Sequence, residues 1–147
     1  MRSRVLGGIL WLFVVPACAP RALRIHLPEG SYVSTTLVRE RAARPAENIT
    51  REVLGRTGHL GYQLVHVRSR EERHFHARQD LVVVLLSGSG VLWMEGERLR
   101  MDPGDVAVVP AGKEHFFVNT GDEPASAFVV SAPPLEAPDV VPVRPRP

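Results

Sequence analysis

Short hydrophobic runs alternate with turn residues along the middle of the chain, from about residue 47 to residue 132. In residues 61–68, for instance, Gln63, Val65 and Val67 fall on one face of an extended strand. Residues 81–86 form an unbroken apolar run, which is typical of a strand buried on both faces. Glycine, proline and aspartate separate these runs, and no segment in this region has a convincing helical period. The pattern predicts one all-β domain, a sandwich or a barrel.

The first 18 residues have the layout of a secretory signal. Arg2 and Arg4 precede an apolar run that is too short to span a bilayer. The Val-Pro-Ala-Cys sequence that ends at Cys18 resembles a bacterial lipobox, and this resemblance implies a signal peptide over residues 1–17 and lipidation of Cys18. Cys18 is the one cysteine of the chain, so no intramolecular disulfide uses it. We therefore expect lipid anchoring in a bacterial cell envelope, on the outer membrane or the periplasmic face; the alternative is a plain secretory signal with an incidental cysteine.

The segments on either side of the predicted domain are richer in proline. Residues 18–46 are broken up by proline and glycine, so we expect a lipid-anchored tether with at most a short helix over residues 36–43. Residues 133–147 hold six prolines, which favours an extended tail and excludes a regular helix. Within this tail, the composition of residues 139–143 allows an edge strand along the domain. The β domain itself is predicted over residues 47–132.

The charge balance argues against nucleic acid as a partner. The chain has 18 basic and 16 acidic residues, a net charge of +2, but loss of Arg2 and Arg4 with the signal leaves 16 of each sign. Nearly all the cations are arginines, Lys113 being the one lysine, and they form no cluster that could follow a phosphate backbone.

The sequence between residues 104 and 119 carries the most specific motif. Its fixed positions follow the pattern glycine-x5-proline-x-glycine-x2-histidine-x3-asparagine, and they are Gly104, Pro110, Gly112, His115 and Asn119. A chance match of all five is on the order of 10⁻⁷ per window at average residue usage. This pattern resembles the second motif of the cupin family. The resemblance covers about residues 49–131 and implies a double-stranded β-helix, a cupin jelly-roll barrel of the all-β class, with His115 as a metal ligand.

The first cupin motif is only partly present. His74 and His76 stand at i and i+2, on one face if that segment is a strand. Leu81, however, stands where the family usually has an acidic metal ligand, and Asp80 is its neighbour. Because adjacent strand residues face opposite ways, Asp80 would need a one-residue shift or a bulge to reach the site. Three alternatives remain open: a three-histidine site of His74, His76 and His115, the same site with Asp80 as a fourth ligand, and a barrel without metal.

Other side chains near the motifs have simpler expected roles. We expect His66 to be an ordinary strand or surface residue and Asn119 to serve packing and hydrogen bonding. Phe117 shares a face with His115 and Asn119, so it should wall a pocket, whereas Phe116 should point the other way. We place Trp93 in the core.

Two hypotheses of function follow from this constellation. Imidazole ligands suit a divalent transition metal such as Fe, Ni, Cu or Zn, and Mn would be favoured if Asp80 joins them. The first hypothesis is a metal-dependent enzyme acting on a small molecule, with dioxygenase or isomerase chemistry as the types that the resemblance implies. The second is a non-enzymatic envelope protein whose barrel binds a small ligand or uses the motif residues only for folding. The resemblance also implies a tendency to form homodimers.

Overall fold

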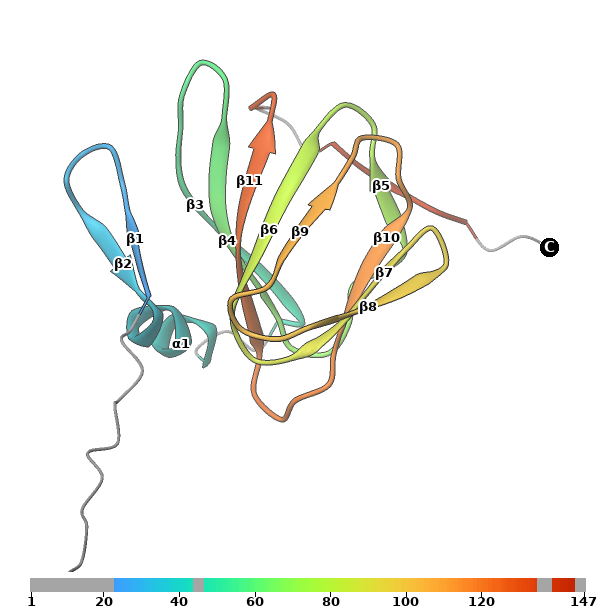
Figure 1. Ribbon diagram of the computed structural model, residues 1–147, viewed down its shortest axis with the longest axis horizontal. Helices are drawn as coiled ribbons and strands as arrows, with labels where there is room; N and C mark the ends of the chain where they lie inside the picture. Colours follow the sequence, from blue (N-terminus) through green and yellow to red (C-terminus); the bar gives the residue numbers. More distant parts are fainter. Residues whose placement is uncertain (1–22, 44–46, 135–138, 145–147) are drawn as a thin grey trace, which may run out of the picture.

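The computed structural model describes residues 23–43, 47–134 and 139–144, and its main body is an antiparallel β barrel (Figure 1). The barrel strands are β3 (Ile49–Arg56), β4 (Gly61–Val67), β5 (His74–His76), β6 (Asp80–Ser87), β7 (Gly90–Met94), β8 (Glu97–Met101), β9 (Val106–Val109), β10 (His115–Asn119), β11 (Ala125–Ala132) and β12 (Val140–Pro142). They form two five-stranded sheets with the orders β12-β5-β10-β7-β8 and β3-β4-β11-β6-β9. From β4 to β11 the chain passes repeatedly from one sheet to the other. This is the jelly-roll arrangement of a double-stranded β-helix, so the predicted fold class is confirmed.

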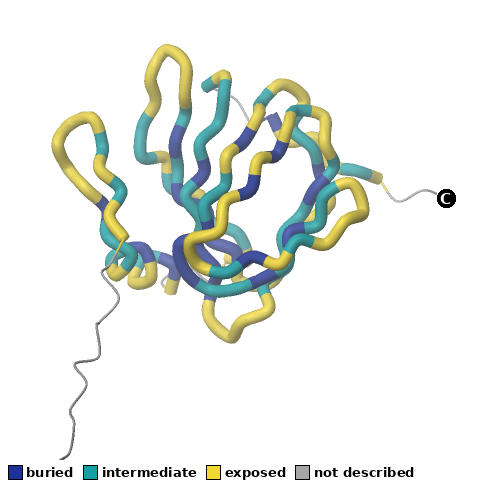
Figure 2. The backbone as a smooth tube through the Cα atoms, in the orientation of Figure 1, coloured by how far each residue is buried: buried dark blue, intermediate teal, exposed yellow. Residues whose placement is uncertain are grey.

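The core of the barrel lies between the inner faces of the two sheets. Val65 of β4, Ala127 of β11 and Leu85 of β6 stand opposite one another across three strands, and all three face inward. From the other sheet, Leu92 and Met101 join the same hydrophobic cluster. Figure 2 shows the consequence most plainly in β9, where exposed and buried positions alternate. The hydrophobic pattern in the sequence therefore corresponds to inward-facing positions.

The segment before the barrel is folded, in contrast to the expected tether. Its elements are β1 (Arg24–His26), β2 (Tyr32–Ser34) and helix α1 (Thr35–Ala43), and they lie against one side of the barrel in Figure 1. Val33 and Val38 pack in a second hydrophobic cluster with Leu64 of β4 and Leu86 of β6. This cluster covers the outer face of the β3-β4-β11-β6-β9 sheet. Residues 24–43 are thus part of the domain, whereas the predictions for residues 1–22, Cys18 included, lie outside the described residues.

The segment after the barrel also returns to it. β12 pairs antiparallel with β5, with Val140 opposite His76 and Pro142 opposite His74, so the edge strand expected over residues 139–143 is confirmed. Asp139 fixes the start of this strand: its carboxylate is buried, and Oδ2 accepts hydrogen bonds from the backbone amides of Arg78 (2.7 Å) and Gln79 (2.9 Å). Among the described residues, no helix is long and apolar enough to cross a membrane.

Candidate metal centre

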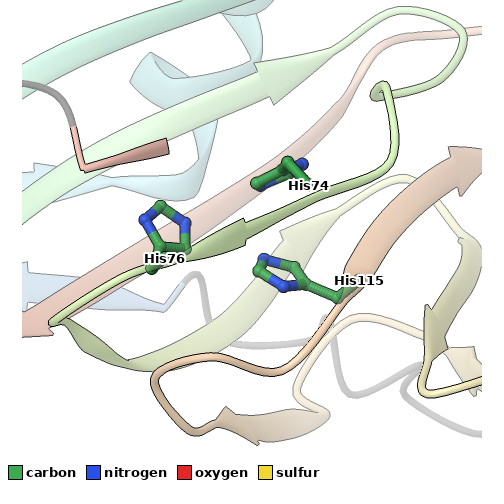
Figure 3. Close-up of side chains that lie close together, drawn as sticks. All are labelled: His74, His76 and His115. Carbon is green, nitrogen blue, oxygen red and sulfur yellow. The ribbon is translucent and has the colours of Figure 1, made fainter. Parts of the chain in front are cut away.

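Three histidine side chains meet inside the barrel (Figure 3). His74 and His76 are the two ends of β5, and their spacing of two residues puts both side chains on its inner face. His115 begins β10 and stands directly opposite His74 in the antiparallel pair. One potential ligand atom from each ring lies within 4.8 Å of the others. The convergence expected from the motifs is therefore present in the structure.

Two of the three rings are oriented by backbone carbonyls. Nδ1 of His74 is 2.7 Å from the carbonyl oxygen of Glu72, and Nδ1 of His115 is 2.9 Å from that of Lys113. A carbonyl accepts only, so each Nδ1 carries the proton and donates it. The lone pair of each ring is then on Nε2 and free to bind a metal. Such outer hydrogen bonds are the usual means of fixing metal-ligating histidines.

The surroundings also favour the neutral form of His76 and His115. Burial, with smaller contributions from the charges of His115 and His74, lowers the pKa of His76 to about 4. Burial is likewise the main reason why the pKa of His115 lies below its usual value. A neutral imidazole is the metal-binding form, so protons compete little with a metal here at neutral pH.

The third ring supplies a direct test of whether a metal fits. Nδ1 of His76 is buried and has no hydrogen-bond partner among the described residues, which is costly for a polar atom unless a group from outside the protein satisfies it. An ion bound at this nitrogen would be that partner. Metal–nitrogen bonds of about 2.1 Å bring ligand nitrogens to about 3–3.5 Å from one another, so small ring rotations from the present spacing suffice. The donor set fits a divalent transition metal, while its identity is left open by three imidazoles alone.

Asp80 does not join this cluster. Its side chain is exposed, and Oδ1 accepts a hydrogen bond of 2.8 Å from the backbone amide of Ala111. The shift or bulge that it would need is absent, because Leu81 pairs in regular register with Ser131 on one side and Val109 on the other. Leu81 is the residue that faces inward, and it is buried against the cavity wall. The alternative with Asp80 as a fourth ligand is therefore wrong for this structure.

A cavity of about 90 Å³ adjoins the three histidines. Most of its wall is apolar, and the wall includes Val65, Leu81, Leu85, Leu92, Phe117 and Val129. This space is enough for a few water molecules or a small organic group. Polar side chains enter it at a few points, and they include Arg51, Gln63, Glu71 and Gln79. A mainly apolar cavity with few convergent polar groups is the usual form of a small-molecule site.

Several side chains near the motifs lie as expected. Phe117 lines the cavity, and Phe116 points to the outside, where its ring stacks on Trp93 at 5.8 Å between centroids. Asn119 serves the fold: its Nδ2 donates to the carbonyls of Arg68 and Glu123, and its Oδ1 accepts from the amide of Gly121.

The expectation for Trp93 was wrong, the expectation for His66 was met in part, and the role of Glu71 was missed. Trp93 is not in the core, because it follows the inward-facing Leu92 and so lies on the outer face, under the guanidinium of Arg98. His66 is a strand residue of β4, which was one of the two expected places, and it is buried, with Nδ1 2.8 Å from Oγ of Ser126. Glu71, which looks like part of a solvated turn in the sequence, lines the cavity and accepts a hydrogen bond from the amide of Phe117. No sequence signal marks Glu71, since its position depends on residues 69–71 running beside β10.

Comparison with known proteins agrees with this geometry. Residues 61–131 match the cupin domain family. The chain is 37% identical over 86 residues to an uncharacterized protein of Aquifex aeolicus, which covers 58% of this chain and 70% of that protein. It is also 45% identical over 58 residues to a glucose-6-phosphate isomerase of Pyrococcus horikoshii, but that match covers only 35% of this chain and 31% of the isomerase.

A solved structure supports the same assignment. The barrel superimposes on KdgF from Halomonas sp. with a TM-score of 0.58 at 25% identity, over 63% of this chain and 86% of that one. The matched domain, the shared fold and the three histidines at the motif positions all point to the same family. The chain belongs to the cupin family.

Proposed function

We propose that this protein binds a divalent transition metal through His74, His76 and His115 and takes a small molecule into the cavity beside it. The observation that carries the proposal is the state of the three rings. They are buried or half-buried, two of them are held by carbonyls in the tautomer that exposes Nε2, and the third has a buried nitrogen without a partner. A barrel that used these residues only for folding would have no need for such an arrangement.

The ligand set leaves room for chemistry at the metal. Three protein ligands leave coordination positions for water or a small molecule, and a bound divalent metal supplies Lewis acidity there. Glu71 is the carboxylate that faces the cavity beside His115, and in an enzyme it would be the residue that accepts or returns a proton. The apolar wall excludes water from the rest of the space. Dioxygenase and isomerase chemistry are both compatible with this set of groups.

Metal analysis tests the proposal most directly. We expect about one equivalent of metal per chain after expression under varied metal supply, and loss of nearly all of it in His76→Ala. His59→Ala is the matched control, because His59 is exposed and lies outside the cluster. Sub-stoichiometric metal in the parent protein under every supply would overturn the proposal and favour the metal-free alternative, a barrel that binds a ligand or serves structure without catalysis.

We further propose that the barrel is held at a bacterial membrane by lipid on Cys18. The support is the signal layout from Arg2 to Cys18. In addition, Cys18 is the one cysteine of the chain, so its thiol cannot be used in an intramolecular disulfide. Globomycin, which blocks lipoprotein signal cleavage, should make the unprocessed form accumulate, and Cys18→Ser should release the protein from the membrane fraction. Unchanged processing and unchanged membrane association would both contradict the anchor.

A further inference from the structure

Arg51 lies at the edge of the histidine cavity and faces into it. It belongs to the edge strand β3 and stands directly opposite Val65 of β4. Residues opposite each other in an antiparallel pair share a face, and Val65 lines the cavity, so the register puts Arg51 on the inner side of the barrel. The same arginine lines a wider groove that continues outward between β3, β4 and β12. Arg51 therefore stands where a molecule entering from solvent reaches the cavity.

No acidic side chain among the described residues neutralises Arg51. The nearby carboxylates are engaged elsewhere: Glu52 pairs with Arg41, and Asp139 pairs with Arg78 and the amides at the start of β6. Gln63 is the diagonal neighbour of Arg51 across the strand pair, at a Cα distance of about 7–8 Å. Gln63 also lines both the cavity and the groove. Its side-chain amide makes no hydrogen bond within the described part of the chain. The two side chains offer unused hydrogen-bond donors on one face.

The metal centre adds to this positive charge instead of cancelling it. Three neutral imidazoles leave the whole charge of a divalent ion uncompensated, because the leucine at position 81 replaces a carboxylate that would have halved it. Glu71 is the one acidic side chain on the cavity wall of the described residues, so the cavity with metal and Arg51 keeps a net positive charge. Arg51 attracts an anion at the entrance of this space, and the metal attracts it inside. A neutral ligand gains neither of these charge–charge attractions.

The size and lining of the cavity narrow the class of anion. A volume of about 90 Å³ with an apolar wall suits a short organic body and not a long chain or a large ring system. An arginine fork binds a carboxylate through two parallel hydrogen bonds, and glutamine can add a third donor.

We propose that the ligand of this site is a small organic carboxylate, with its carboxylate on Arg51 and Gln63 and its apolar body against the cavity wall. This inference rests on the proposed metal site and names the class of molecule that the site takes. Arg51 acts in it as a specificity-determining residue.

Matched pairs of ligands test the inference in full-length protein purified in detergent. Lactate and benzoate are titrated by calorimetry against lactamide and benzamide, which have nearly the same shape without the charge. We expect each carboxylate to bind at least about tenfold more tightly than its amide, and Arg51→Gln to remove that preference while Arg51→Lys keeps part of it. Arg98→Gln is the control, because Arg98 carries the same charge on the outer face beside Trp93. Added salt should weaken binding of the carboxylates more than that of the amides.

Metal content, measured on the same samples, separates this inference from the proposed function. Stoichiometric metal with equal affinity for carboxylate and amide, or a preference that survives in Arg51→Gln, overturns the inference and leaves the metal site standing. Absence of metal together with an Arg51-dependent preference for carboxylates overturns the metal site and supports the inference on Arg51 alone. Loss of the preference in Arg98→Gln to the same degree as in Arg51→Gln would also overturn it, since the effect would then be one of net charge.

Discussion

Replacement of Leu81 by glutamate tests whether this position faces the metal. Leu81 is 6% exposed and lines the cavity that the three histidines share. In the metal-free protein, Leu81→Glu loses about 1.5–3 kcal/mol of apolar burial. It also puts a carboxyl group against an apolar wall, at a further cost of about 1–3 kcal/mol. We therefore expect the free energy of unfolding to fall by roughly 2.5–6 kcal/mol without metal.

The expected effect has the opposite sign when metal is present. A carboxylate beside three imidazoles completes a four-ligand set that suits Mn²⁺ in particular. We expect the affinity for Mn²⁺ to rise at least about tenfold, which corresponds to about 1.4 kcal/mol. Because a ligand of the folded state stabilises it by mass action, added Mn²⁺ should raise the melting temperature of Leu81→Glu more than that of the parent.

Leu85→Glu is the matched control for this experiment. Leu85 lies on the same inner face of β6 and is equally buried, but it is four residues farther along the strand, at about 13 Å. It should lose comparable stability and gain no affinity for metal. The assay is thermal unfolding with chelator and with a series of Mn²⁺ concentrations. An unchanged Mn²⁺ affinity in a folded Leu81→Glu protein, or an equal gain in Leu85→Glu, would refute the placement of Leu81 beside the metal.

Three further predictions test other parts of the structure. Asp80→Asn should keep the full metal content of the parent, because the carboxylate of Asp80 accepts a hydrogen bond from the amide of Ala111 and does not bind the metal. Loss of metal in this variant would mean that Asp80 is a metal ligand. Val38→Ala, at a fully buried position of α1, should lower the free energy of unfolding in urea by about 1–3 kcal/mol, and no change would mean that α1 does not pack on the barrel. His66→Gln should destabilise the protein by about 1–3 kcal/mol through its lost bond to Ser126. Burial lowers the pKa of His66 in the folded state, so the unfolded chain takes up a proton first as the pH falls below about 6.5; parent stability should fall there, and the melting temperatures of His66→Gln at pH 7.5 and 5.5 should differ less.

The barrel and its histidines were predictable because their signals are local. Gly104 and Gly112 have φ angles of +101° and +77°, values that a side chain rarely adopts, so a glycine at each turn is a backbone requirement. The spacing of His74 and His76 fixes their common face once the segment is extended. The pairing of β10 with β5 then puts His115 opposite His74. These two strands are far apart in the sequence, so this last step was expected only from the resemblance to the family motifs.

The packing of the N-terminal segment was not predictable for the same reason. Val33 and Val38 are too few to give a helical or strand period. Their role in packing is visible only from their cluster with Leu64 and Leu86, which lie far along the chain. A short segment with few apolar residues, whose contacts lie in distant parts of the chain, is easily taken for a linker. The sequence of residues 24–43 is weakly patterned. It therefore does not show that barrel residues complete the hydrophobic cluster in which this segment packs.

The error at Trp93 comes from assigning a face by residue type. Trp93 is large and apolar, yet strand alternation puts Leu92 inward and leaves Trp93 outside, where Phe116 and Arg98 cover its ring. The period of two was the better guide. It also puts His66 on the face opposite to Val65, where Ser126 satisfies one nitrogen of the buried ring.

The leucine at position 81 connects the departure from the family motif with the charge of the site. Its strand pairs in regular register, so no local shift can bring Asp80 inward in its place, and the cavity wall stays apolar there. A divalent ion held by His74, His76 and His115 then has only neutral protein ligands. Its charge must be met by water, hydroxide or the bound molecule, and an anionic molecule meets it best. Arg51 lies at the edge of the same cavity, has no acidic partner in the described part of the chain, and favours the same choice. The missing acid thus changes which ligands the site prefers, while the histidine geometry needed for metal binding is kept.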